Sequence, residues 1–147
     1  MASLEQQDIR WLQRFSNFRK ALNRLRQAVE ITEEKQIFGE VVSELLVDGL
    51  IHRFEYTHMQ AWRTMRDYVE YQGYGSHDGI RKAIRKALEI NIIDDVRWMD
   101  TIDDRNQTSH YYDNETAARL FDNITKIYFP LFCRFEEKMI EKIQMFE

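Results

Sequence analysis

Glycine and proline are scarce in this sequence, at five and one of 147 residues, where average usage would supply roughly 18 of the two together. So few turn residues exclude most all-β architectures and favour a small number of long helices. Cys133 is the only cysteine, which excludes an intrachain disulfide and a cysteine-based zinc site. No apolar run reaches the roughly 18 residues of a membrane span, and the amino terminus lacks a secretory apolar region. We therefore expect a cytoplasmic protein without a membrane segment.

The length suits one domain with its own core. A chain of this size buries roughly 68–70% of the surface that it exposes when unfolded, so it needs neither metal nor disulfides to fold. The sequence contains no internal repeat, low-complexity stretch or linker. We expect residues 1–147 to form a single domain. Its 25 acidic and 21 basic residues give a formal charge of −4, which argues mildly against a polyanionic partner.

Apolar residues recur three and four positions apart over three long segments, which is the spacing of amphipathic helices. The pattern predicts helices over residues 8–31 and 37–71 and a last helix that begins after Asp113-Asn114 and continues to about Met145, with Pro130 kinking or splitting it. The first apolar stripe consists of Leu12, Phe15, Phe18, Leu22, Leu25 and Val29. We expect an all-α, antiparallel up-and-down bundle with a four-helix core and about five helices.

Two shorter helices are expected between the long ones. One spans residues 78–90 with Ser76 as its N-cap, and the other opens at Asp94 and Asp95, since acidic residues suit a helix N-terminus. The polar faces of the first long helix carry an excess of four positive charges. A solvated face is the more favoured interpretation of that excess, and an RNA- or partner-facing surface is the alternative.

A polar stretch from Asp103 to Asn114 interrupts the apolar pattern before the last helix. In an uninterrupted α-helix, five steps of about 100° would place the side chains of Arg105 and His110 roughly 140° apart. The two can converge only if the helix ends between them, and the intervening Asn, Thr and Ser residues favour such an ending. In an extended chain His110 and Tyr112 would share a side. An arginine, a histidine and a tyrosine together suit phosphate chemistry.

The same residues also allow a purely structural interpretation. Arg105 could pair with Asp100 or Asp104, His110 could cap a helix, and Tyr112 could close the edge of the core. Spacing alone favours this interpretation, because short motifs have high false-positive rates.

The run Arg105–Asp113, RNQTSHYYD, resembles the R-N-x-T-S-H-x-Y-D signature of the HEPN family, in its branch of nucleotidyltransferase substrate-binding proteins related to HepT-type toxins. Departures occur at Met59-Gln60, where the branch often has Glu-Leu, and at Ser76-His77, where it often has Ser-Pro. The similarity covers most of the chain, because further matches occur in order: WLQRFSNFRKAL from Trp11, GLIHRFEYT from Gly49, Ala61-Trp62, IRKA from Ile80, and Trp98 seven residues before Arg105.

This resemblance implies a helical bundle that pairs as a homodimer and brings two copies of the Arg-x4-His motif to one cleft. Many members are ribonucleases that need no metal and no cofactor. The resemblance then implies that His110 acts as base or acid on the ribose 2′-hydroxyl and leaving oxygen. Arg105 would stabilise negative charge at phosphorus, and Asn106 would orient the phosphate or the histidine.

The resemblance also implies a small nucleotidyltransferase as partner, which in the toxin–antitoxin version attaches AMP to Tyr112 and blocks RNA by charge and volume. The alternative is a non-catalytic subunit that binds nucleotide or substrate for the nucleotidyltransferase, with Arg105 and His110 gripping phosphate. No metal site is expected, because His52 and His58 would point about 120° apart on a helix. Glu55 is expected to be a buried carboxylate with its hydrogen bonds satisfied.

Overall fold

The computed structural model describes residues 4–33, 39–108 and 114–145, and every regular element over these residues is a helix. The elements are α1 (Leu4–Glu33), α2 (Glu40–Tyr71), α3 (Ile80–Glu89), α4 (Trp98–Gln107), α5 (Asn114–Asn123), a π-helical segment (Ile124–Tyr128) and α6 (Phe129–Gln144). The last three run on without interruption and form one long helix. The expected five helices are therefore present, and the all-α fold class is confirmed.

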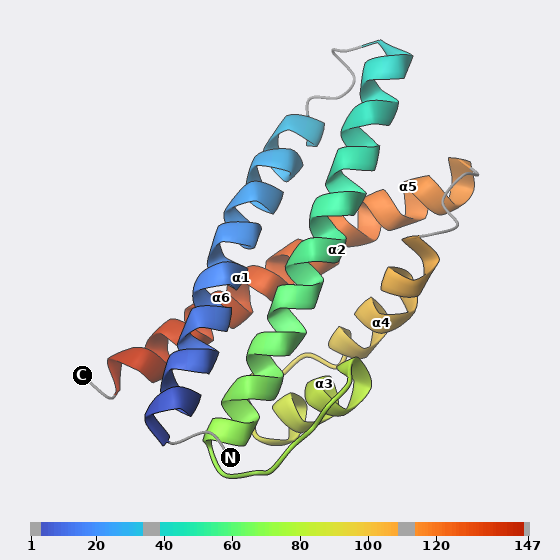
Figure 1. Ribbon diagram of the computed structural model, residues 1–147. Coiled ribbons are helices and arrows are strands. Elements are labelled where there is room, and N and C mark those ends of the chain that lie inside the picture. The colour runs from blue at the N-terminus through green and yellow to red at the C-terminus, as the bar shows by residue number, and fades with distance from the viewer. Residues whose placement is uncertain (1–3, 34–38, 109–113, 146–147) are drawn as a thin grey trace.

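Apart from the short α3, the helices alternate in direction as in an up-and-down bundle. α1 and α2 lie side by side and antiparallel, α4 rises beside α2, and the last helix descends obliquely across the hairpin (Figure 1). Its first half, α5, contacts α2, and its second half, α6, contacts α1. Two ends therefore meet on one side of the bundle, namely the end of α4 and the beginning of α5. The signature run Arg105–Asp113 begins in the last turn of α4, and α5 starts directly after it.

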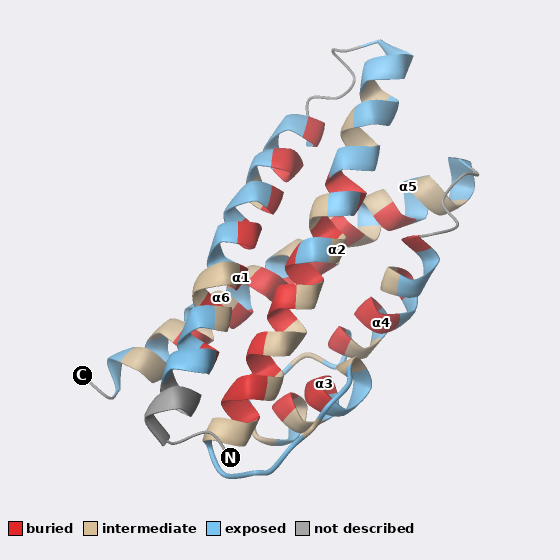
Figure 2. Ribbon diagram, in the orientation of Figure 1, coloured by how far each residue is buried: buried red, intermediate tan, exposed pale blue. Residues whose placement is uncertain are grey.

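The buried apolar residues form one core cluster in which α2 is central (Figure 2). Phe54 and Met65 of α2 are fully buried, as the pattern predicts. The predicted stripe of α1 is confirmed except at Leu12, whose side chain is 41% exposed. Trp11 takes its place in the core and is 4% exposed, because the true stripe begins one position earlier. None of the described helices is long and apolar enough to cross a membrane.

Pro130 disturbs the last helix as predicted, and the structure shows how. A proline ring has no N–H and clashes with the carbonyl group four residues before it. The π-helical segment Ile124–Tyr128 lies directly before Phe129 and Pro130 and adds one residue to the turn there. The helix therefore continues past the proline without splitting. The inserted residue changes which side chains share a face.

The beginnings of the two short helices differ from the expectation. α3 begins after Gly79, which has φ of 105° and no side-chain cap, so Ser76 does not cap it. α4 begins at Trp98, three residues after Asp95. The Asp95 carboxylate accepts a hydrogen bond from the backbone N–H of Arg97 at 2.9 Å and so forms a turn before the helix.

Candidate functional site

The site predicted from the sequence lies at the end of α4. Arg105 and Asn106 belong to its last turn, whereas His110 and Tyr112 lie outside the described residues. α4 ends at Gln107, so the α-helix stops between Arg105 and His110 as predicted. At this end Thr108 donates its hydroxyl to the backbone carbonyl of Arg105 at 2.7 Å. A hydroxyl bonded three residues back competes with the regular helical pattern, which is the effect expected of this polar stretch.

Arg105 is half-buried and acts electrostatically on His58 of α2. His58 is fully buried, and its burial together with the positive charge of Arg105 lowers its pKa to about 3. The imidazole is therefore neutral at physiological pH. A neutral ring does not compensate the positive charge of Arg105.

The hydrogen bonds of His58 define its protonation. Its Nε2 lies 2.7 Å from Oγ1 of Thr101, and that hydroxyl lies 2.6 Å from the carbonyl oxygen of Trp98. Because a hydroxyl has one proton, the arrangement that satisfies both bonds has Thr101 donating to the carbonyl and Nε2–H donating to Thr101. Nδ1 then carries no proton, and it has no hydrogen-bond partner among the described residues. His58 therefore links α2 to α4 one turn before Arg105.

Asp104 points to the last helix instead of pairing with Arg105. The residue is buried, at 6% exposed. Three side chains donate hydrogen bonds to its carboxylate: Arg119 at 2.6 Å, Asn123 at 2.8 Å and Tyr128 at 2.5 Å. We call these four residues the Asp104 cluster. Burial alone would raise the pKa of Asp104, but these hydrogen bonds outweigh it, and the pKa lies below its usual value.

Arg105 is not part of the Asp104 cluster. Consecutive helical side chains diverge by about 100°, so Arg105 does not share the face from which Asp104 contacts the last helix. No ion pair among the described residues includes Arg105, and the salt bridge of Asp104 is formed with Arg119. The structural interpretation that paired Arg105 with Asp104 is therefore wrong. Asn106 is exposed beside it.

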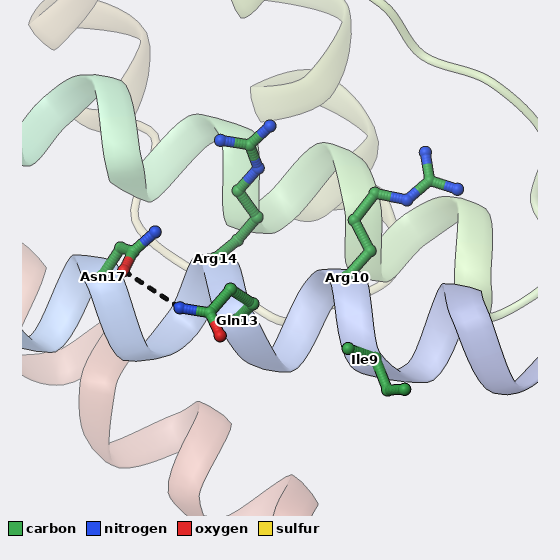
Figure 3. A pocket seen from close by; sticks show the side chains of 5 residues that line it. All are labelled: Ile9, Arg10, Gln13, Arg14 and Asn17. Carbon is green, nitrogen blue, oxygen red and sulfur yellow. Dashed lines mark hydrogen bonds between the residues drawn. The ribbon is translucent and has the colours of Figure 1, made fainter.

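Arginines of α1 form a separate basic surface. Arg10 and Arg14 extend together from α1 toward α2, and Gln13 bonds Asn17 below them (Figure 3). These four residues and Ile9 line a hollow of about 330 Å³. Arg14 is already paired with the buried Asp67 of α2 at 3.2 Å. Arg14 therefore stabilises the α1–α2 contact.

The described residues contain no group of three metal-ligating side chains close enough to hold an ion. His52 is exposed and His58 is buried, which agrees with their expected divergence. Glu55 is half-buried, so the expectation of a buried carboxylate is wrong at this position.

Comparison with known proteins bears on the family of the chain. The family described as nucleotidyltransferase substrate binding protein like matches residues 13–141. The chain belongs to this family. The match includes all of the helices that form the core except the first turns of α1 and the last residues of α6.

Individual relatives agree with this family assignment. A protein of Haemophilus influenzae named probable ribonuclease HepT is 29% identical over 89 residues, which cover 57% of this chain and 61% of the relative. The chain thus spans less than two thirds of that relative's length in this match.

Two solved structures share the fold. One, from Haemophilus influenzae, is described as showing the fold of a substrate binding domain of a nucleotidyltransferase. It has a TM-score of 0.76 at 23% identity, covering 84% of this chain and 97% of the other. A protein of Thermus thermophilus has a TM-score of 0.65 at 25% identity, covering 85% of this chain and 97% of the other.

Neither the Asp104 cluster nor the hydrogen bonds of His58 follow from the spacing of the sequence. Two signals could have indicated the cluster. An aspartate in the last turn of a helix opposes the helix dipole, and a proline inside a long helix predicts a local change of pitch. Neither signal identifies the partner 24 residues away.

Proposed function

We propose that this chain is a metal-independent ribonuclease of the HEPN type, and that it works with a small nucleotidyltransferase. One observation carries the proposal: α4 ends between Arg105 and His110, and the half-buried Arg105 forms no ion pair with any of the described residues. A relative named as a probable ribonuclease supports the same activity.

The proposed reaction needs two functions, proton transfer and charge stabilisation. His110 removes the proton of a ribose 2′-hydroxyl, whose oxygen attacks the adjacent phosphorus. The imidazolium of the second His110 copy in the proposed dimer cleft donates a proton to the 5′-oxygen as it leaves, so the products are a 2′,3′-cyclic phosphate and a 5′-hydroxyl. Free imidazole has a pKa of about 6.5, so both of its protonation states occur near neutral pH. Arg105 stabilises the negative charge that grows on the phosphate oxygens, and Asn106 orients the phosphate or His110.

Cleavage of RNA by purified variants tests these roles. We expect His110→Ala and Arg105→Ala each to lower the cleavage rate by roughly 100-fold or more. The matched controls are His52→Ala and Arg134→Ala, whose side chains are exposed and outside the signature. These controls should cleave at the wild-type rate. Equal cleavage by all five proteins would refute the assignment.

A homodimer is part of the proposal, because two copies of the motif would share one cleft. Large apolar side chains are exposed on both helices near the α1–α2 connection, which is typical of association surfaces: Ile31, Val41, Val42 and Leu45. Sedimentation equilibrium of the full chain should give twice the monomer mass of 17.9 kDa. A monomer over the whole concentration range would contradict a shared cleft.

Control by the nucleotidyltransferase is proposed to act through Tyr112. Its phenol oxygen takes AMP from ATP and releases pyrophosphate. The added phosphate and base then exclude RNA from the neighbouring His110 by charge and volume. Co-expression with the nucleotidyltransferase should add the mass of AMP to wild type and to Tyr111→Phe, but not to Tyr112→Phe. An equal mass shift in Tyr112→Phe would refute the modification site.

The second candidate is a non-catalytic subunit that holds nucleotide or substrate for the nucleotidyltransferase. The description of the Haemophilus influenzae structure as a substrate binding domain favours it. Here Arg105 and His110 bind phosphate without turnover. Titration with ATP distinguishes the two: binding that depends on Arg105, with no RNA cleavage, would support this candidate over the ribonuclease.

A further inference from the structure

Asp104 occupies a position that local preferences disfavour. It lies in the last turn of α4, where the carbonyl end of the helix dipole repels an anion. It is also buried, and a buried carboxylate is costly unless it is hydrogen-bonded. Tertiary contacts must therefore account for its presence. The contacts are those of the Asp104 cluster, all of them from the last helix.

The π-helical segment brings two of these partners onto one face. Asn123 and Tyr128 are five residues apart, and in a regular α-helix their side chains would diverge by about 140°. Asn123 immediately precedes the segment and Tyr128 ends it. The wider turn aligns residues that are five apart, so both side chains reach the Asp104 carboxylate, at 2.8 and 2.5 Å. Such insertions are frequent at functional sites.

The result is a rigid attachment at a place where a short helix would otherwise fray. α4 has ten residues, and helix ends open more readily than helix centres. Arg119 adds a contact from α5, so the cluster links the last turn of α4 to the second turn of α5. Arg105 directly follows Asp104. The rotation of its Cα about the helix axis is thus fixed by the hydrogen bonds of its neighbour.

We propose that the Asp104 cluster positions Arg105, with Asp104, Asn123 and Tyr128 acting as positioning residues that do not touch the substrate. The inference rests on the proposed function, in which Arg105 and His110 act on one phosphate. The π-helical segment then allows the last helix to hydrogen-bond the end of α4 through both Asn123 and Tyr128.

The test measures where the charge of Arg105 lies, using the imidazole of His110 in the full-length protein as the reporter. Its pKa is followed by NMR titration in wild type, Arg105→Ala, Asn123→Ala and Tyr128→Phe. A cation near an imidazole lowers its pKa by about one unit or more, so Arg105→Ala should raise the pKa of His110 by about one unit. Asn123→Ala and Tyr128→Phe change no charge and retain Asp104. They should nevertheless move the pKa of His110 at least half as far in the same direction.

Thr125→Val is the matched control. It removes a hydroxyl from the same part of the last helix, where Thr125 donates to the carbonyl of Phe121 at 2.9 Å and is not one of the donors to Asp104. Its His110 pKa should equal that of wild type. All titrations are run at least 15 °C below each variant's melting temperature, so that loss of folding is separated from loss of position. Tyr128→Phe conserves volume and is the variant expected to fold best.

The outcomes separate the inference from the function on which it rests. If Arg105→Ala raises the pKa and the two cluster variants leave it unchanged, the positioning role is wrong and the proposed site survives. If Arg105→Ala itself has no effect, Arg105 and His110 do not share a site, and both proposals are overturned. A shift in Thr125→Val as large as in the cluster variants also refutes the specific role of the cluster.

Discussion

Tyr128 donates a hydrogen bond to Asp104 across 2.5 Å, and both side chains are buried. Burial, followed by the hydrogen bond and the charge of Asp104, raises the pKa of Tyr128 far above its usual value. The phenol therefore keeps its proton and donates this hydrogen bond near neutral pH. This bond joins the π-helical segment to the residue directly before Arg105.

Removing this hydroxyl should destabilise the fold. Hydrogen bonds to charged groups contribute about 1.5–3 kcal/mol, and the Asp104 carboxylate retains only two donors after the change. We expect Tyr128→Phe to lower the free energy of unfolding by about that amount in urea denaturation. Tyr74→Phe is the control, because Tyr74 is 48% exposed. Equal stability of both variants would show that the bond contributes nothing to the fold.

His58 should make the protein sensitive to mild acid. Its pKa is about 3 in the folded protein and about 6.5 in the unfolded chain. Between these values the unfolded chain binds the extra proton, so the free energy of unfolding falls as the pH falls. The slope approaches 1.4 kcal/mol per pH unit, which is about 5 kcal/mol over the whole interval.

The replacement His58→Gln removes this titration and leaves an amide that can still bond Thr101. Between about pH 6 and pH 4, wild type should lose roughly 1 kcal/mol per pH unit more than His58→Gln. Denaturation at a series of pH values measures the difference. His52→Gln is the control and should behave as wild type, because its side chain is exposed. Parallel stability curves for wild type and His58→Gln would contradict the buried, neutral imidazole.

Gly49 offers a stabilising change. It lies inside α2, and a Cβ added there meets no atom within 4 Å. Because glycine costs about 0.5–1 kcal/mol relative to alanine within a helix, Gly49→Ala should raise the melting temperature by roughly 2–4 °C. Gly73→Ala should lower it, since Gly73 has φ of 88°. A lower melting temperature for Gly49→Ala would indicate that another surface packs closely on this glycine.

Much of the fold could be predicted from the sequence because its helices are long and strongly periodic. Phe15, Phe18 and Leu22 lie in the core where the spacing places them. The prediction that Leu12 is buried is wrong because Trp11, one position away, fills the same end of the stripe with a larger side chain. The predicted N-cap of α3 is wrong because Gly79, which has a positive φ, precedes its first turn in place of Ser76.

The candidate site was predictable only in its local part. The end of α4 after Arg105 follows from hydroxyl and amide side chains that compete for the backbone, and Thr108 makes that contact. The attachment of Asp104 depends on a contact 24 residues away and on a change of helical pitch. Spacing rules assume a constant pitch, so they cannot place Tyr128 opposite Asp104.

The most direct measurement of the central claim is the chemistry of RNA cleaved by the wild-type protein in the presence of EDTA. The substrates are an RNA oligonucleotide and the same sequence with 2′-deoxyribose throughout. Attack by a 2′-hydroxyl predicts fragments with 2′,3′-cyclic phosphate and 5′-hydroxyl ends from the RNA, and no cleavage of the DNA. No cleavage of RNA, cleavage of the DNA, or RNA fragments with 3′-hydroxyl and 5′-phosphate ends would contradict the role assigned to Arg105 and His110.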